Sequence, residues 1–265
     1  MIESTSPGSD MPIDAGNRLQ PAGALDLPPP FYAVALREVG DAFVHAIRIA
    51  PDSGAGTLVH VGRFDLVEFA VVLEPEEPLR TARRAIYAGL VALADALAVY
   101  APPEKPISFE WPDGIRINGG LVGGARLAWP PRVDEDAPPP WLIFGGMIGT
   151  TPVGEQEPGL YPLATTLDAE GFDIGSGGLL EGFARHLMVT VNAWQQDGFG
   201  EVARSYLSRL APGSDVRRAI DDNGDLLVHR VGHSKAECRS LVSALAAPSW
   251  FDPATGSPVL RARHE

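Results

Sequence analysis

The sequence has almost no cysteine and almost no lysine. Cys238 is the single cysteine among 265 residues, so no internal disulfide can form, and the scattered histidines show no spacing typical of a metal site. Lys105 and Lys235 are the only lysines, so arginine carries nearly all positive charge, and its planar guanidinium suits bidentate contact with carboxylate or phosphate. We therefore expect a cytoplasmic protein without a tightly bound metal, and little chemistry that depends on lysine.

The sequence also lacks a segment that would direct it to or through a membrane. Residues 1–27 are polar and acidic, with no basic stretch followed by an apolar one, so no secretory signal is expected. The longest apolar run, residues 90–101, contains Asp95 and is too short to span a bilayer. A net charge of −13 and a pI near 4.9 disfavour binding to nucleic acid or to an anionic membrane surface.

Composition divides the chain into three parts. Residues 1–27 are rich in Pro, Gly, Ser and Asp without periodicity, which is typical of a flexible tail. Residues 28–211 carry the regular hydrophobic patterns and are predicted to form one domain. The character changes in residues 212–265, where we expect a small C-terminal module containing both α and β structure.

Hydrophobic periodicity predicts strands that alternate with isolated helices. Strands are expected at residues 31–39, 57–61, 66–73 and 141–148, and as short strands within 107–128. Helices are expected at 41–50, 79–97, 199–210 and 235–246, and from Ser176 to Trp194. Asp41 and Ser176 are the expected N-caps, and Asp113-Gly114 and Asn118-Gly119 are hairpin signals. The pattern favours an α+β fold with a mixed, largely antiparallel sheet and helices packed on it.

Residues 110–128 carry the most distinctive pattern, EWPDGIRINGGLVGGARLA. It resembles the signature of the biotin/lipoate protein ligases, in which a Lys-Trp-Pro-Asn-Asp strand is followed by a tight turn and a Lys-Leu-x-Gly strand. Later segments occur in a similar order: paired glycines at 145–146, Thr-Thr-Leu at 165–167, a long amphipathic helix, and Trp194 followed by Asp-Gly-Phe at 197–199. The resemblance spans roughly residues 56–210 and implies the class II ligase-like catalytic fold.

The chemistry of that family implies a set of substrates and site residues. A carboxylate attacks the α-phosphate of ATP to form an acyl-adenylate, which a lysine of an acceptor domain then captures. The resemblance implies ATP with Mg²⁺ as cofactors, lipoate, octanoate or biotin as the acid, and a lipoyl- or biotinyl-acceptor domain as the partner. The residues implied to line the acyl or adenylate slot are Trp111, Pro112, Asp113, Gly119, Gly120, Gly123 and Gly124, the glycines because they permit close backbone approach.

The sequence departs from the family pattern where positive charge is needed. The signature lysine falls at Gly120 or Leu121, Glu110 replaces the lysine before Trp-Pro, and the Gly-Arg-Gly-Arg-type loop is reduced to residues 60–65. Loss of a positioned cation from a phosphoryl-transfer site typically costs on the order of 10³-fold in rate. Arg63 and Arg126 are therefore the candidate catalytic residues that bind phosphate or carboxylate in its place.

Two other functions stay open on the sequence. A noncatalytic member of the family would bind an acyl group, a nucleotide or a lipoyl-type domain without chemistry, and the missing lysine favours it. An ATP-independent acyltransferase would need a nucleophile, for which Cys238 is the candidate, although its place in the C-terminal module is typical of an inert thiol. Arg116 is a further candidate cation.

Overall fold

A seven-stranded sheet forms the centre of the molecule. The structure is a computed structural model that describes residues 25–37, 40–152, 163–211 and 216–258. The strands follow the order β1-β2-β3-β7-β6-β5-β4. β1 is parallel to β2, and every other adjacent pair in this sheet is antiparallel. The strands are β1 (Tyr32–Leu36), β2 (Thr57–Val61), β3 (Leu66–Leu73), β4 (Ile107–Glu110), β5 (Gly114–Ile117), β6 (Gly120–Ala128) and β7 (Leu142–Gly149).

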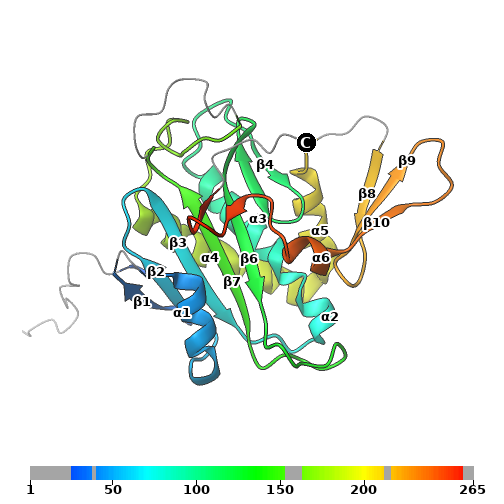
Figure 1. Ribbon diagram of the computed structural model, residues 1–265, viewed down its shortest axis with the longest axis horizontal. Coiled ribbons are helices and arrows are strands. Elements are labelled where there is room, and N and C mark those ends of the chain that lie inside the picture. The colour runs from blue at the N-terminus through cyan, green and yellow to red at the C-terminus, as the bar shows by residue number, and fades with distance from the viewer. Residues whose placement is uncertain (1–24, 38–39, 153–162, 212–215, 259–265) are drawn as a thin grey trace, which may run out of the picture.

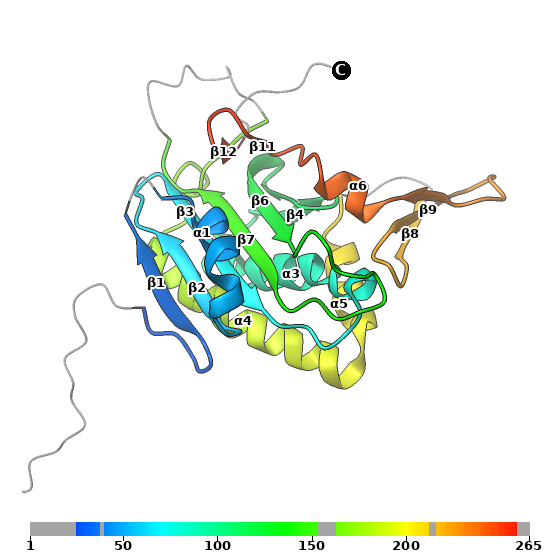
Figure 2. The same cartoon turned by 60° about the horizontal axis from the view of Figure 1, so that its bottom comes forward.

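Helices cover both faces of this sheet unequally. The long helices α3 (Ala85–Ala98) and α4 (Ser176–Asp197), with α5 (Phe199–Ser208), pack on one face (Figures 1 and 2). The opposite face carries α1 (Ala42–Ile49), which lies over β2, β3 and β7 and continues into the 3-10 turn η1 (Ala50–Asp52). A short helix, α2 (Leu79–Ala82), precedes α3. The expected α+β class with a largely antiparallel sheet is confirmed.

Strand β3 shows how the sequence places the two cores. Because successive side chains of a strand point to opposite faces, Phe69 and Val71 join the core under α3 and α4, whereas Ala70 and Val72 join the smaller core under α1. Full burial of a large apolar side chain stabilises the fold by roughly 1.5–3 kcal/mol. The same alternation places Glu68 on the α1 face, where it is buried.

The C-terminal residues form a small second sheet that packs against the main domain. It contains β8 (Val216–Ile220), β9 (Leu226–Arg230) and β10 (Glu237–Arg239) in the order β10-β9-β8, and it is followed by α6 (Leu241–Leu245), β11 (Phe251–Asp252) and β12 (Ser257–Pro258). Leu226 and Val228 belong to the same core cluster as α3. Tyr87 Oη on α3 also donates a hydrogen bond to Gly224 O at 2.6 Å. The apolar side of this module is therefore continuous with the main core.

Several predicted elements agree with the structure in detail. β2 and β3 have the expected bounds. Asp41 caps α1, and its Oδ1 accepts a hydrogen bond from the Val44 N–H at 2.8 Å. Asn118 and Gly119 both have positive φ, 51° and 84°, in the turn between β5 and β6, as the hairpin signal predicts.

Other predicted elements were wrong. The single helix expected at 79–97 is divided into α2 and α3 at Arg83 and Arg84. Ser176 is the first residue of α4, and Gly175 is its N-cap. The helix expected at 235–246 is reduced to α6, because residues 237–239 pair with β9 as strand β10. Pairing with a distant strand overrides local propensity there.

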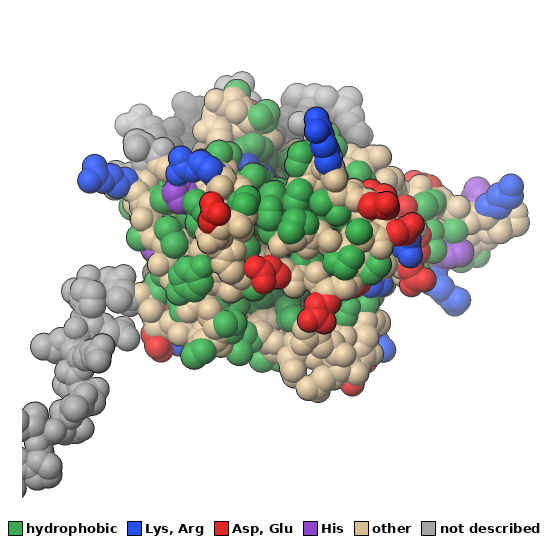
Figure 3. Space-filling view, turned by 90° about the horizontal axis from the view of Figure 1, so that it is seen from below, with side chains coloured by type: hydrophobic (Ala, Val, Ile, Leu, Met, Phe, Trp, Pro, Cys, Tyr) green, Lys and Arg blue, Asp and Glu red, His purple; other side chains and the backbone are tan. Residues whose placement is uncertain are grey.

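Charged side chains of both signs are scattered over the surface. Figure 3 shows Asp and Glu side chains over the body, and basic and histidine side chains both at the end where the small second sheet projects and at the opposite end. Residues 25–27 lie against α4, where the Asp26 N–H donates to Glu181 Oε1 at 2.8 Å. The rest of the expected tail lies outside the described residues. Within the described ranges, the helices are too short or too polar to cross a bilayer.

Candidate functional site

Arg63 and Arg126 both interact electrostatically with one buried carboxylate, Glu68, on the α1 face of the sheet. Glu68 of β3 is 4% exposed, and its Oε1 accepts a hydrogen bond from the Ala42 N–H at 2.7 Å. Burial raises the pKa of Glu68, while the charges of Arg126 and Arg63 partly oppose that rise. The fold therefore brings the two predicted catalytic arginines to a shared cluster, although one follows β2 and the other lies on β6.

The Arg126 guanidinium is held between two aromatic rings. Its Cζ lies 4.3 Å from the ring centroid of Phe43 on α1 and 4.5 Å from that of Phe251 on β11. Its Nη2 lies 3.7 Å from Asp41 Oδ1, and the side chain is 18% exposed. Burial lowers the pKa of Arg126, and Asp41 and Glu68 oppose this effect. The rings and carboxylates fix the position of a cation that remains charged at every physiological pH.

Arg126 borders a cavity of about 440 Å³. The remaining lining is mostly apolar and comes from α1, β6, the end of α6 and the segment that follows it: Phe43, Leu127, Leu245, Ala246, Ala247, Pro248, Phe251 and Pro253. This volume falls in the range typical of small-molecule sites. An apolar cavity with one guanidinium at its edge has the form needed to hold a carboxylate on an aliphatic or ring-bearing body.

The Arg63 guanidinium contacts a neighbouring carboxylate in a bidentate way. Its Nε lies 3.0 Å from Asp65 Oδ1 and its Nη2 lies 2.7 Å from Asp65 Oδ2. This contact holds the pKa of Asp65 below its usual value. The cluster thus contains the two cations Arg63 and Arg126 and the three carboxylates of Asp41, Asp65 and Glu68. The sheet face carries charge of both signs and no excess of positive charge.

The space beside Gly124, expected to hold an acyl or adenylate group, contains a side chain of the C-terminal segment. A Cβ at Gly124 would lie 2.5 Å from Trp250 Cδ2 and 2.5 Å from Asp113 O. Trp250 is 1% exposed and packs with Leu66 and Met147. Glycine is required at position 124 because other atoms lie close to its backbone, as predicted. These atoms belong to Trp250 and to the β4–β5 turn, not to a ligand.

Asp113 is a second buried carboxylate, besides Glu68, whose pKa is raised. It is 1% exposed, and burial raises its pKa to about 7, while the Trp250 indole opposes the rise. Among the described residues, neither Asp113 Oδ1 nor Trp250 Nε1 has a hydrogen-bond partner, so the indole N–H is not aligned on the carboxylate. Asp113 therefore titrates near neutral pH inside the protein and does not line the cavity beside Arg126.

The other predicted slot residues lie in different places. Trp111 Nε1 donates a hydrogen bond to Tyr87 Oη at 3.0 Å, and its ring lines a second cavity between β4 and the small sheet. The carbonyl of Pro112 accepts a hydrogen bond from Tyr206 Oη at 2.9 Å. Both residues are fixed to helices on the far face of the sheet, so they do not share the cavity beside Arg126.

Three glycines of the signature segment have structural explanations. Gly119 lies in the β5–β6 turn, with open space where its Cβ would be. A Cβ at Gly123 would lie 1.9 Å from Met147 O on the neighbouring strand. A Cβ at Gly120 would lie 2.8 Å from Thr165 Cγ2. Of the two expected positions of the signature lysine, Gly120 has no room for a longer side chain in this arrangement, and Leu121 carries an uncharged one.

The remaining candidates do not join the cluster. Arg116 donates to Glu110 Oε2 from Nε and Nη2, at 2.9 and 2.5 Å, near the edge of the sheet. Cys238 is exposed on β10, with its Sγ 3.8 Å from Asp225 Oδ2. Slight desolvation and then the charge of Asp225 raise the pKa of the Cys238 thiol, which is opposite to what a nucleophile needs.

Sequence reasoning missed Glu68 and Trp250. Glu68 had a recognisable signal, because it is the single charged residue in the otherwise apolar run of β3. A buried carboxylate is rare without a partner, so such a residue marks a site or a structural ion pair. Trp250 had no local signal, since its position over Gly124 is set by packing between distant segments.

Comparisons with known proteins agree with the fold and the signature segment. The sequence model of the biotin/lipoate A/B protein ligase family matches residues 27–208. The biotin–[acetyl-CoA-carboxylase] ligase of Paracoccus denitrificans is 24% identical over 179 residues, which cover 60% of this chain and 71% of that protein. A biotin protein ligase-like protein of unknown function from a Silicibacter species superposes with a TM-score of 0.72 at 27% identity, over 83% of this chain and 98% of that one.

A characterised ligase shares the same fold at lower identity. The biotin protein ligase of Aquifex aeolicus superposes with a TM-score of 0.59 at 17% identity, over 79% of this chain and 95% of that chain. The structure of that enzyme with biotin and ATP superposes with a TM-score of 0.53 at 16% identity, over 78% and 98% of the two chains. These identities show the fold alone.

Proposed function

The chain belongs to the biotin/lipoate A/B protein ligase family, and we propose that it activates a small carboxylic acid with ATP and transfers the acyl group to a lysine of an acceptor domain. The acid is lipoate, octanoate or biotin, and the acceptor is a lipoyl- or biotinyl-type domain. The observation that carries this proposal is the position of Arg126, a fixed guanidinium at the edge of an apolar cavity of about 440 Å³.

In this proposal, Arg126 binds the carboxylate and the cavity holds the apolar body of the acid. Guanidinium and carboxylate form charge-assisted hydrogen bonds, which are about twice as strong as neutral ones. Phe43 and Phe251 provide apolar contact beside the charged group. Arg63, which also interacts electrostatically with Glu68, supplies the second cation for the phosphate of the nucleotide. Together, Arg126 and Arg63 supply the positive charge that the missing signature lysine would provide.

The reaction has two steps. A carboxylate oxygen attacks the α-phosphorus of ATP, and the bond from that phosphorus to the bridging oxygen breaks, which releases pyrophosphate. The lysine amine then attacks the acyl carbon, loses a proton and releases AMP. Arg126 and Arg63 stabilise the negative charge that develops on the phosphate and carboxylate oxygens. The described residues contain no group of three or more His, Cys, Asp or Glu arranged for a metal, so we propose that Mg²⁺ is bound through the nucleotide phosphates.

A noncatalytic role is the second candidate, and two observations favour it. Neither Gly120 nor Leu121, the expected signature positions, carries a charge, and Trp250 fills the space beside Gly124. The three carboxylates around Arg63 and Arg126 also reduce the attraction of the site for phosphate. A protein of this kind would bind the acid or the acceptor domain without forming an adenylate.

ATP–pyrophosphate exchange separates these two functions. The full chain is assayed with lipoate, octanoate and biotin in turn, and binding of each acid is measured by calorimetry. We expect exchange with one acid and a loss of at least about 10²-fold in Arg126→Ala, the size typical of a removed electrostatic stabiliser. Arg204→Ala is the matched control, because Arg204 is 71% exposed on α5 and pairs with Glu201. Binding of an acid without exchange would support the noncatalytic role.

Arg63→Ala and Cys238→Ala complete the test. We expect Arg63→Ala to raise the KM for ATP more than the KM for the acid, because Arg63 is assigned to the phosphate. We expect Cys238→Ala to retain full activity. Loss of acyl transfer in Cys238→Ala, with transfer that needs no ATP, would instead establish the acyltransferase alternative.

A further inference from the structure

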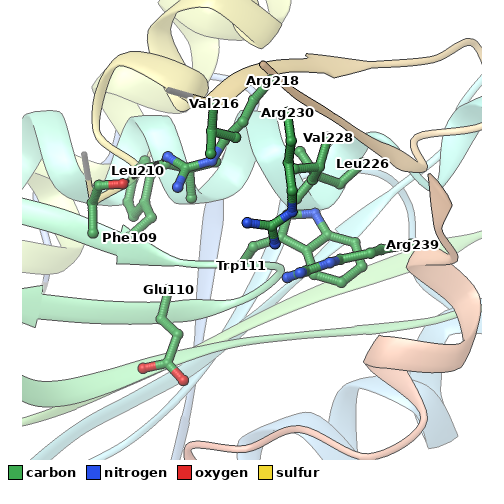
Figure 4. A pocket seen from close by; sticks show the side chains of 11 residues that line it. Phe109, Glu110, Trp111, Leu210, Val216, Arg218, Leu226, Val228, Arg230 and Arg239 are labelled. Carbon is green, nitrogen blue, oxygen red and sulfur yellow. Dashed lines mark hydrogen bonds between the residues drawn. The ribbon is translucent and has the colours of Figure 1, made fainter. Parts of the chain in front are cut away.

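A second cavity, of about 510 Å³, lies between the main domain and the small C-terminal sheet. Arg218 on β8, Arg230 on β9 and Arg239 on β10 line it from the module, and Trp111 lines it from the main domain. Figure 4 shows Arg230 and Arg239 extending from the small sheet toward Trp111, with Arg218 along the same wall. We propose that this cavity binds a small organic phosphate.

Positive charge exceeds negative charge in this cavity, in a chain whose net charge is −13. Arg239 Nε lies 2.7 Å from Glu237 Oε1, and Arg230 Nη2 lies 3.6 Å from Glu237 Oε2, so one carboxylate serves two guanidiniums. Arg218 Nη1 donates to the backbone carbonyl of Ala211 at 2.6 Å, a neutral partner. Among the described residues, three cations and one carboxylate leave an excess of two positive charges.

Glu110, the one acidic residue in the described lining, does not neutralise these arginines. Glu110 Oε2 accepts hydrogen bonds from Arg116, and its Oε1 lies 3.4 Å from Ser249 Oγ. In Figure 4 its carboxylate points away from the three guanidiniums. The excess charge therefore faces the cavity, where Arg230 and Arg239 are 52% and 45% exposed and accessible to a ligand.

The charge and the walls together define the class of ligand. A phosphate group carries close to two negative charges at neutral pH and presents several acceptor oxygens, which matches two unneutralised guanidiniums better than a single carboxylate does. Phe109, Leu210, Val216, Leu226 and Val228 form an apolar wall, and Trp111 adds an indole ring. The cavity thus suits a phosphate that carries an apolar or planar body, at a volume typical of small-ligand sites.

This inference is independent of the proposed ligase function. In the part of the chain that the structure describes, the two cavities share no lining residue, and Arg126 lines only the first. Failure of ATP–pyrophosphate exchange would therefore leave this second cavity untouched. Conversely, a phosphate that bound only beside Arg126 would leave the ligase proposal intact and overturn this one.

Calorimetric titration of the full chain tests the inference with four probes: inorganic phosphate, pyrophosphate, AMP and citrate. We expect AMP and pyrophosphate to bind more tightly than citrate, and raised salt to weaken them. The double variant Arg230→Ala/Arg239→Ala should weaken binding by about tenfold or more, as expected for lost hydrogen bonds to a charged group. Arg204→Ala is the control and should bind as the wild-type chain does.

Glu237→Gln gives a result that a purely structural role would not produce. This change removes the carboxylate that competes with the ligand for Arg230 and Arg239, so affinity for AMP and pyrophosphate should rise by several-fold. The inference is overturned if none of the phosphates binds, if citrate binds as tightly as AMP, or if Arg126→Ala abolishes binding while the double variant does not. Circular dichroism of each variant checks that the fold is retained.

Discussion

The two cavities of this molecule differ in how deeply their arginines are buried and in how many carboxylates surround them. On the α1 face, Arg126 borders the first cavity, and Arg126 and Arg63 are largely buried near the three carboxylates of Asp41, Asp65 and Glu68. In the cavity beside the small sheet, Arg230 and Arg239 are half exposed and share one carboxylate. Burying an uncompensated charge costs several kcal/mol, whereas water solvates an exposed one. A buried site must therefore be nearly neutral before its ligand arrives, and an exposed site can hold excess charge.

The largest expected effect in this comparison comes from removing the indole that packs against Gly124. Trp250→Ala should lower the free energy of unfolding by about 3–5 kcal/mol, the range for deleting a buried aromatic side chain. Urea denaturation followed by circular dichroism measures the change. Val231→Ala is the control, because Val231 is 78% exposed, and its effect should stay within about 0.5 kcal/mol. A loss below about 1 kcal/mol for Trp250→Ala would show that the indole is not packed as described.

A second effect, on the order of 4 kcal/mol, concerns the pH dependence of stability. Asp113 has a pKa of about 7 in the folded protein, against 3.8 as its ordinary value. The folded state therefore holds one more proton than the unfolded state between about pH 4 and pH 7, so the contribution of Asp113 to stability falls as pH rises through this window.

Asp113→Asn isolates this contribution. The free energy of unfolding of wild type minus that of the variant should fall between pH 5 and pH 8, and Glu68, whose pKa is also raised, cancels in the difference. Urea titrations at several pH values give the difference directly. A flat difference would mean that Asp113 is ionised in the folded protein at all of these pH values.

Gly124→Ala should have a smaller effect, about 1–3 kcal/mol, the usual cost of overpacking. The new methyl group would lie 2.5 Å from Asp113 O and from Trp250 Cδ2, so the C-terminal segment has to shift. Gly62→Ala is the matched glycine control, since no atom lies within 4 Å of its Cβ position. Thermal unfolding compares the two variants, and equal melting temperatures would contradict the close packing at Gly124.

The smallest expected effect belongs to the exposed arginines of the second cavity. Arg230→Ala and Arg239→Ala should each change the free energy of unfolding by less than about 1 kcal/mol, because exposed ion pairs contribute little to stability. The same variants should weaken phosphate binding. Strong destabilisation by either variant would mean that these side chains hold the small sheet in place, and the contrast between the two cavities would fail.

Local patterns predicted much of the fold. Strand β3 follows from its own run of β-branched and aromatic residues. The start of α1 follows from the capping side chain of Asp41. Both signals depend only on residues that are close in sequence. Strand β10 was missed because residues 237–239 gain their partner from β9, and no pattern within the segment encodes that pairing. Elements that depend on distant partners are the ones that sequence patterns predict poorly.

The candidate site was predicted only in part. The resemblance indicated Arg63 and Arg126, and both lie beside Glu68. It placed Trp111 in the same slot as the other signature residues, although Trp111 lines a different cavity, and it gave no indication of Trp250. A motif shows which residues lie near one another along the chain, whereas burial and packing across the sheet decide which side chains share a cavity.

The covalent link between Trp250 and the sheet that it covers has a consequence for any ligand of the α1 face. A tethered group is present at its own site at an effective concentration in the millimolar range, whatever the dilution of the protein. A molecule that enters the space beside Gly124 must compete with an indole held at that concentration. Occupancy there is therefore governed by the length and freedom of the segment that carries Trp250, as much as by the fit of the ligand.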